Sequence, residues 1–131
     1  MMMSPGTYLT KRRQAAGLSV DDVAALVSTS PRLGEVDRRA WIERIEKDIA
    51  AISPDVAATL ADVFPISRLV LQQLIDLRSY GVCSQPAPRL CVTCGCSDRD
   101  PCIDPASHDG CAWASEDLCT SCTGKDSPHA A

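Results

Sequence analysis

The distribution of cysteine most constrains what this chain can fold into. All eight cysteines fall in residues 83–131, and none in residues 1–82. The large apolar side chains of the cysteine-rich segment are few: Leu90, Val92, Ile103, Trp113 and Leu118. Burial of so few side chains cannot offset the conformational entropy lost on folding. Such a segment is either disordered or cross-linked by metal ions or disulfides, and its cysteine content favours cross-links.

Two C-x2-C pairs form the best candidate metal site. Cys91 and Cys94 make the first pair and Cys119 and Cys122 the second, with 24 residues between the pairs. A tight turn at each pair brings two thiolates together, and two such turns complete a tetrahedral zinc site with zinc–sulfur distances of about 2.3 Å. The separation is longer than the usual ~15–20 residues. The pattern therefore predicts a metal, with zinc preferred and an iron–sulfur cluster as the alternative.

Three further cysteines and a histidine lie between the two pairs. A second, Cys3His zinc site would use Cys96, Cys102, His108 and Cys111. A disulfide or simple buried thiols are the competing interpretations. Cys83 stands apart and is expected to be a free thiol. Trp113 is expected to cover the metal site as its small core.

The net charge of −4 is carried by the cysteine-rich segment. Residues 1–82 hold ten Lys and Arg against ten Asp and Glu, whereas residues 83–131 hold three against seven. An acidic segment is a poor nucleic-acid ligand by itself. Contact with DNA would need a local basic face within residues 1–82.

Neither a targeting segment nor an enzyme motif is expected. Residues 1–6 lack the apolar core of a signal peptide, and no run approaches the ~18 apolar residues of a membrane span. We therefore expect a cytoplasmic protein, in which a cysteine cluster indicates metal binding before disulfides. A closed four-thiolate site leaves no open coordination position for catalysis. With no Ser–His–Asp set, P-loop or H-E-x-x-H motif, the chain is not expected to be an enzyme.

Residues 1–82 carry helix signals and no strand signal. The pattern predicts a first helix over residues 8–16 that ends at Gly17, and a second that begins after Ser19 with Asp22 completing a capping box. Ser53 is expected to cap a fourth helix and Ser67 a fifth. The sequence therefore predicts an all-α bundle of about five short helices, followed by a loop-rich, metal-stabilised module.

The third helix is expected to run from an N-cap at Asp37 to about Asp48. Ile42, Ile45 and Ile49 recur at helical spacing and would form its apolar stripe.

Four stretches in this order resemble the lambda-repressor-like (XRE, Cro/C1-type) helix-turn-helix family. They are Leu9 to Ser19, Val20 to Ala24, Ile42 to Lys47, and Pro54 to Leu60 with Phe64-Pro65-Ile66. The resemblance covers residues 8–78. It implies a DNA-binding bundle whose third helix enters the major groove.

The resemblance also implies roles for individual residues. Arg38, Arg39 and Arg44 would point outward from the third helix toward base edges. Lys11 and Arg12 would meet phosphates. Arg13 and Glu46 match a family ion pair that would join the first helix to the third.

The domain organisation follows from these patterns. We expect a helical domain over residues 1–78, a linker over 79–90, a zinc-binding module over 91–123 and a flexible tail over 124–131.

The cysteine spacing resembles small modules of phage and prophage-type proteins. The leading hypothesis is a transcriptional regulator of phage or mobile-element origin that binds double-stranded DNA, with its module used for stability, dimerisation or protein contact. The alternatives are a protein-binding adaptor or inhibitor, and an iron–sulfur or thiol redox sensor.

Overall fold

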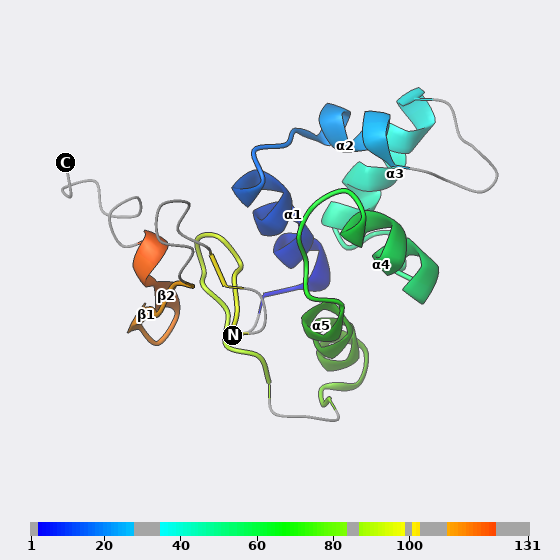
Figure 1. Cartoon of the computed structure of the whole chain (residues 1–131). Helices are drawn as coiled ribbons and strands as arrows, with labels where there is room; N and C mark the ends of the chain where they lie inside the picture. The colour runs from blue at the N-terminus through cyan, green and yellow to red at the C-terminus, as the bar shows by residue number, and fades with distance from the viewer. Residues whose placement is uncertain (1–2, 28–34, 84–86, 99–100, 103–109, 123–131) are drawn as a thin grey trace.

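The chain is mostly helical, with a small two-stranded sheet near its C-terminal end (Figure 1). The computed structural model describes residues 3–27, 35–83, 87–98, 101–102 and 110–122. The helices are α1 (Pro5–Ala15), α2 (Val20–Leu26), α3 (Glu35–Glu46), α4 (Pro54–Ala61) and α5 (Arg68–Tyr80). The strands β1 (Trp113–Ser115) and β2 (Leu118–Cys119) pair antiparallel. The sequence pattern did not predict this sheet.

Serine side chains cap the helices where the sequence predicts them. The hydroxyl groups of Ser19, Ser53 and Ser67 each accept a hydrogen bond from a backbone N–H in the first turn of α2, α4 and α5. Asp22 closes the capping box, since its carboxylate accepts from the backbone N–H of Ser19. A hydroxyl acceptor at this position satisfies one of the unpaired donors of the helix end. These three predicted helix starts are confirmed.

The first helix begins earlier than predicted. Ser4 accepts from the backbone N–H of Thr7, and Pro5 occupies the first helical position. Proline is favoured there because it has no N–H to leave unpaired. The predicted start at Tyr8 was therefore wrong by one helical turn. Gly17 lies just past the helix with φ of 75°, as the predicted stop requires.

The bounds predicted for the third helix were also wrong. Because α3 begins at Glu35, Asp37 lies inside its first turn and is not its N-cap. The helix ends at Glu46, and Asp48 follows with φ of 61°, which a right-handed α-helix does not accommodate. The Asp48 carboxylate instead accepts from the backbone N–H of Gly6 at 2.8 Å. Ile49 lies beyond the helix, 69 % exposed, and does not belong to its apolar stripe.

One hydrophobic core holds the helices together. Helix α2 packs on α3, α1 contacts both α3 and α5, and α4 packs on α5. Tyr8 is fully buried at the centre, and its hydroxyl accepts from the backbone N–H of Ser67 at 2.9 Å. Leu90 belongs to the same core. The cysteine-rich segment is therefore anchored to the helices through Leu90, just before the first C-x2-C pair, and it lies beside α1 (Figure 1). Within the described ranges, no helix has the length and apolarity needed to span a membrane.

Candidate metal centre

The first C-x2-C pair lies on a tight hairpin turn. Leu90 and Ser97 form an antiparallel bridge at its base. The backbone N–H of Cys91 donates to the Cys96 carbonyl at 3.0 Å, and that of Gly95 donates to the Cys91 carbonyl at 2.9 Å. Gly95 has φ of 76°, a left-handed conformation that favours glycine. The turn therefore holds its cysteines at one end of a narrow loop.

The second pair lies where the small sheet ends. Cys119 is the last residue of β2, and residues 120–122 form a helical turn that carries Cys122. The backbone N–H of Val92 donates to the Asp117 carbonyl at 2.9 Å. This bond joins the first turn to the β1–β2 turn, so backbone geometry brings the two cysteine pairs together.

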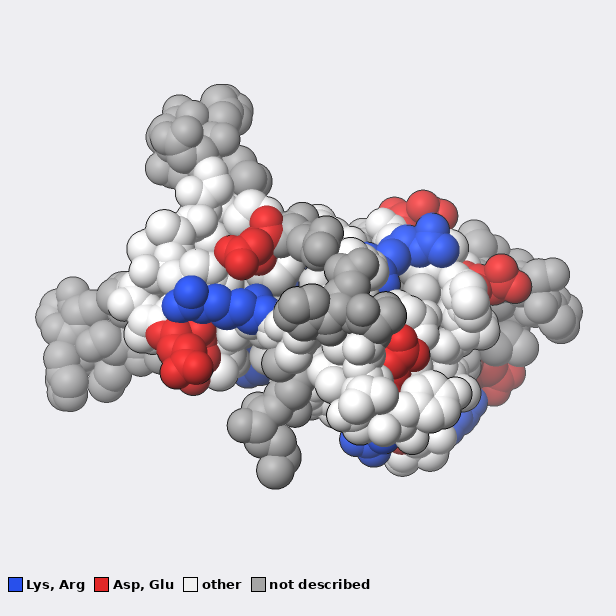
Figure 2. Space-filling model, turned by 90° about the horizontal axis from the view of Figure 1, so that it is seen from below, with Lys and Arg blue, Asp and Glu red and all other residues white. Residues whose placement is uncertain are grey.

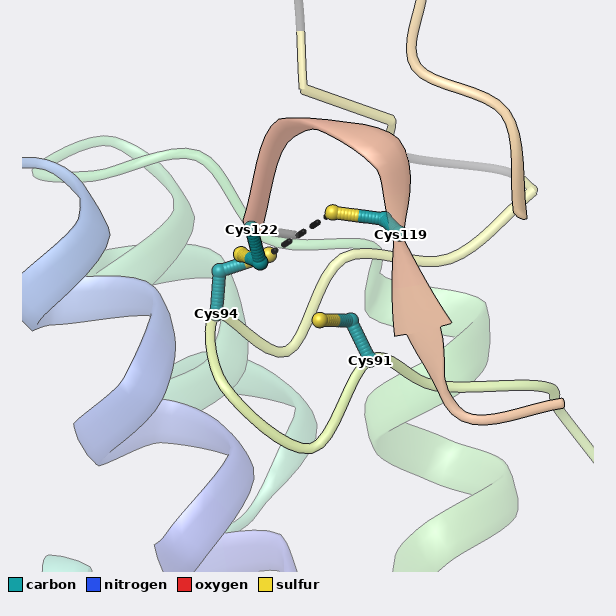
Figure 3. A group of neighbouring side chains, drawn as sticks. All are labelled: Cys91, Cys94, Cys119 and Cys122. Atoms are coloured by element: carbon teal, nitrogen blue, oxygen red, sulfur yellow. Dashed lines mark hydrogen bonds between the residues drawn. The ribbon is translucent and has the colours of Figure 1, made fainter. Parts of the chain in front are cut away.

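The four predicted ligands converge. The sulfur atoms of Cys91, Cys94, Cys119 and Cys122 all lie within 4.8 Å of one another, and Figure 3 shows their side chains directed toward a common centre. Their residues are between 0 % and 9 % exposed. A tetrahedron of sulfurs about 2.3 Å from zinc has edges of about 3.8 Å, and the Cys94 and Cys119 sulfurs lie 3.8 Å apart. The cluster can hold a metal ion, and its geometry fits a closed four-thiolate site.

A second group of four sulfur atoms also lies close together in the structure. Cys96 and Cys102 lie with Cys94 and Cys119, again all within 4.8 Å of one another. This group differs from the predicted second site, since it includes Cys94 and Cys119, which are also ligands of the predicted first site. The Cys111 sulfur lies 3.7 Å from that of Cys96 but is not in this group.

His108, predicted as a ligand of the second site, lies outside the described residues. Cys83 is half-buried and belongs to neither group of sulfurs.

The thiols share protons unevenly. A hydrogen bond from the Cys96 side chain lowers the pKa of Cys94 to about 4, against the opposing effect of burial. The same hydrogen bond, together with burial, raises the pKa of Cys96. Burial raises the pKa of Cys102 to about 12 and also raises that of Cys122. The cluster thus stabilises one thiolate among neighbouring thiols, whose protons a metal ion would displace.

Trp113 packs against the cysteine cluster, the position the sequence predicts for it. Its indole N–H donates to the Asp98 carboxylate at 2.7 Å. The Arg89 guanidinium lies over the ring, 4.4 Å from its centroid, and donates to the carbonyls of Ser115 and Glu116. Neither Arg89 nor Asp98 was predicted to contact Trp113, because nothing in their spacing along the chain links them to it.

Helix α1 supports the first cysteine turn. Arg12 is 6 % exposed; its Nη1 donates to the Cys94 carbonyl at 3.3 Å and its Nε to the Pro65 carbonyl at 3.2 Å. A β-carbon added to Gly95 would lie 3.0 Å from Cβ of Lys11. The turn is therefore in direct contact with the helix. The expectation that Arg12 meets phosphates was wrong, because its guanidinium is buried and donates hydrogen bonds to the carbonyls of Cys94 and Pro65.

The remaining predicted DNA contacts differ in exposure. Arg38 is 6 % exposed, and its Nε donates to the Ala24 carbonyl at 2.6 Å. The expectation that it points outward was wrong, since it joins α3 to α2. Arg39 is exposed but pairs with Asp21 at 3.3 Å and Glu43 at 3.0 Å.

Arg44 is exposed on α3, and Lys11 is half-buried on α1. Blue and red side chains are interspersed on the face in Figure 2. Of the three arginines predicted to read bases, Arg39 and Arg44 are exposed, whereas Arg38 is buried.

The ion pair implied by the family resemblance is present. The Arg13 Nε donates to Glu46 Oε2 at 2.7 Å and its Nη2 to Oε1 at 3.0 Å. Both side chains are about nine-tenths buried, at 11 % and 10 % exposure. Thr10 donates to the same carboxylate, and the Arg13 Nη1 donates to the Leu18 carbonyl. The pair therefore fixes α1 against the end of α3.

Comparison of the chain with known protein families, curated proteins and solved structures finds no significant match. Its function is therefore argued from its own residues.

Proposed function

We propose that the chain is a DNA-binding regulator whose C-terminal module is folded around a structural zinc ion held by Cys91, Cys94, Cys119 and Cys122. The convergence of these four sulfurs, from turns 25 residues apart in sequence, is the observation that carries the proposal. Thiolate is the ligand that structural zinc prefers, and four of them close its coordination sphere. The zinc would stabilise the module and would not catalyse a reaction.

The small apolar core of the cysteine-rich segment supports a structural role for the metal. The cluster packs against only two large apolar side chains among the described residues, Trp113 and Leu118. Binding of zinc to small sites of this kind supplies on the order of 10 kcal/mol of folding free energy. That is enough to order a segment with so little core.

Zinc content and chelation test the metal part. Protein purified without oxygen is expected to contain zinc. Chelation is expected to remove the amide-exchange protection of Cys91, Gly95 and Thr120, whose N–H groups are hydrogen-bonded in the two turns. The Cys83→Ser variant is the control, because Cys83 lies outside both sulfur groups. Brown protein containing iron and inorganic sulfide would instead favour the sensor hypothesis.

Two features support DNA binding by the helices. The predicted order of helices is accompanied by the buried pair of Arg13 and Glu46, which the family resemblance implies. Arg39 and Arg44 are exposed on α3, the helix that the resemblance assigns to the major groove. An arginine fork on that helix suits guanine O6 and N7.

An electrophoretic mobility-shift experiment on genomic fragments tests this role. Replacement of Arg39 or Arg44 by Ala is expected to weaken binding at least about fivefold, since one base contact contributes about 1 kcal/mol or more. Arg78→Ala, an exposed arginine at the end of α5, is the matched control and should bind as the wild type does. Binding should also weaken as salt rises.

A protein-binding adaptor is the second candidate, and the arginine geometry favours it. Arg12 and Arg38 are buried against carbonyls, and Arg39 is paired with acids. Fewer free cations mean fewer displaced counterions and weaker phosphate attraction. Absence of salt-sensitive binding to any fragment, with both α3 variants indistinguishable from the control, would select the adaptor.

A further inference from the structure

The cysteine cluster contains more sulfur than one zinc ion can use. Four thiolates fill a tetrahedral zinc site, yet six sulfurs take part in the two groups. Cys94 and Cys119 belong to both groups, Cys91 and Cys122 to the first alone, and Cys96 and Cys102 to the second alone.

From this sharing we propose that the cluster binds two zinc ions, bridged by the thiolates of Cys94 and Cys119. Cys91 and Cys122 complete the coordination of one ion, and Cys96 and Cys102 that of the other. The inference extends the proposed function, because it takes the first zinc site as given and adds a second ion to it.

The distances around the shared cysteines support bridging. The Cys94 sulfur lies 3.8 Å from that of Cys119 and 3.5 Å from that of Cys102. Both values are close to the sulfur–sulfur edge of about 3.8 Å in a tetrahedral zinc site. The Cys94 sulfur thus lies at a distance suited to sharing a zinc ion with Cys102, a member of the second group alone, and it also belongs to the first group. A thiolate has lone pairs enough to coordinate two metal ions at once.

Cys96 and Cys102, the cysteines found in the second group alone, would have no metal ion if one zinc were bound. Cys96 is fully buried, and its sulfur lies within 4.8 Å of the sulfurs of Cys94, Cys102 and Cys119. With one zinc bound, Cys96 and Cys102 would remain thiols in contact with a cluster of charge −2. A second zinc ion displaces their two protons, and the charge stays at −2, because two Zn²⁺ ions face six thiolates.

The surroundings suit an anionic cluster. The buried guanidinium of Arg12 donates to the carbonyl of Cys94, one of the bridging residues. A positive charge held close to a dry anionic centre lowers its electrostatic free energy.

Cys111 provides a built-in control. Its sulfur lies 3.7 Å from that of Cys96 but outside both groups of four. In a bridged cluster it is not required, whereas the site composed of Cys96, Cys102, His108 and Cys111 would depend on it. Replacement of Cys111 therefore separates the two arrangements.

Zinc counting on the full chain, purified without oxygen, is the first test. The wild type is expected to hold about two zinc ions per chain, Cys102→Ser about one and Cys111→Ser about two. One zinc in the wild type, unchanged in Cys102→Ser, would overturn the second ion and leave the proposed single site intact. Loss of an ion in Cys111→Ser would overturn bridging. No zinc at all would remove both proposals.

Cobalt(II) substitution tests bridging in the wild type, independently of whether a variant folds. The paramagnetic resonance signal is expected to grow up to about one equivalent of cobalt and to fall as the second enters, because shared thiolates couple the two spins. X-ray absorption should show a metal–metal distance below about 4.6 Å, twice the metal–sulfur distance. A signal that doubles at two equivalents, without metal–metal scattering, would overturn the bridged cluster.

Discussion

Arg12 on α1 donates a hydrogen bond from Nη1 to the main-chain carbonyl of Cys94, 3.3 Å away. The same guanidinium donates from Nε to the Pro65 carbonyl after α4. One buried cation thus joins the helical core to the first cysteine turn. Because Leu90 also lies in the helical core, the metal centre and the helices are expected to be coupled in stability.

Replacement of Arg12 by Met should weaken both parts. The variant keeps an apolar stem but leaves the carbonyls of Cys94 and Pro65 without this donor. We expect a loss of about 2 kcal/mol in the free energy of unfolding, the scale of hydrogen bonds from a charged group, together with faster loss of metal to a chelator. Urea unfolding and metal-release rates measure the two effects. Gln14→Ala, an exposed position on the same helix, should change neither. Equal behaviour of the two variants would contradict the coupling.

Gly95→Ala tests the contact between the cysteine turn and α1. The added β-carbon would lie 3.0 Å from Cβ of Lys11 and 3.3 Å from Cδ of Arg12. Gly81 has the same φ of 76°, and a β-carbon there meets nothing within 4 Å. Gly81→Ala should therefore cost only backbone strain, about 1 kcal/mol. Gly95→Ala should cost about 1–3 kcal/mol more, because the contact must open.

The comparison of the two glycine variants has a second readout. Metal affinity should fall in Gly95→Ala and stay unchanged in Gly81→Ala, since only Gly95 adjoins a ligand. If thermal unfolding and competition with a metal indicator show equal losses for both variants, the turn does not depend on α1.

The buried pair of Arg13 and Glu46 predicts that Glu46 contributes much more to the free energy of unfolding than Glu43, which lies on the same helix, α3. Glu46→Gln removes a charge that accepts from Arg13 in a nearly dry setting, and we expect a loss of about 3 kcal/mol in unfolding free energy. Glu43→Gln removes one of the two acidic partners of Arg39 in an exposed pair, and should cost less than about 1 kcal/mol. Chemical denaturation of both variants gives the comparison. Similar small losses would mean that the buried pair does not fix α1 to α3.

Local signals made much of this fold predictable. Ser19, Ser53 and Ser67 begin helices because a serine hydroxyl can accept from the first turn, a rule that needs only neighbouring residues. The convergence of two C-x2-C pairs was predictable for the same reason, since each turn is local and a metal accounts for their meeting.

Tertiary partners account for the predictions that failed. Arg12 and Arg38 look like free cations in the sequence, but distant backbone carbonyls bury them. The sharing of Cys94 and Cys119 between two groups of sulfurs was equally hidden. Spacing indicates which cysteines are neighbours along the chain, and only the folded turns place one sulfur between two sets.

The capping box of α2 predicts a pH-dependent stability. Hydrogen bonds from the Ser19 backbone and side chain hold the pKa of the Asp22 carboxyl below its usual 3.8. A lowered folded-state pKa stabilises the fold above the unfolded-state pKa, and that stabilisation is lost as pH falls through the folded-state value. The difference in unfolding free energy between wild type and Asp22→Asn should thus be full at pH values well above the usual 3.8 and vanish as pH falls through the lowered folded-state pKa. Asp76→Asn, which removes a carboxylate that accepts from Gln72 on α5, controls for lost charge. Denaturation curves in which both variants lose stability in parallel across this range would show that the capping box does not control it.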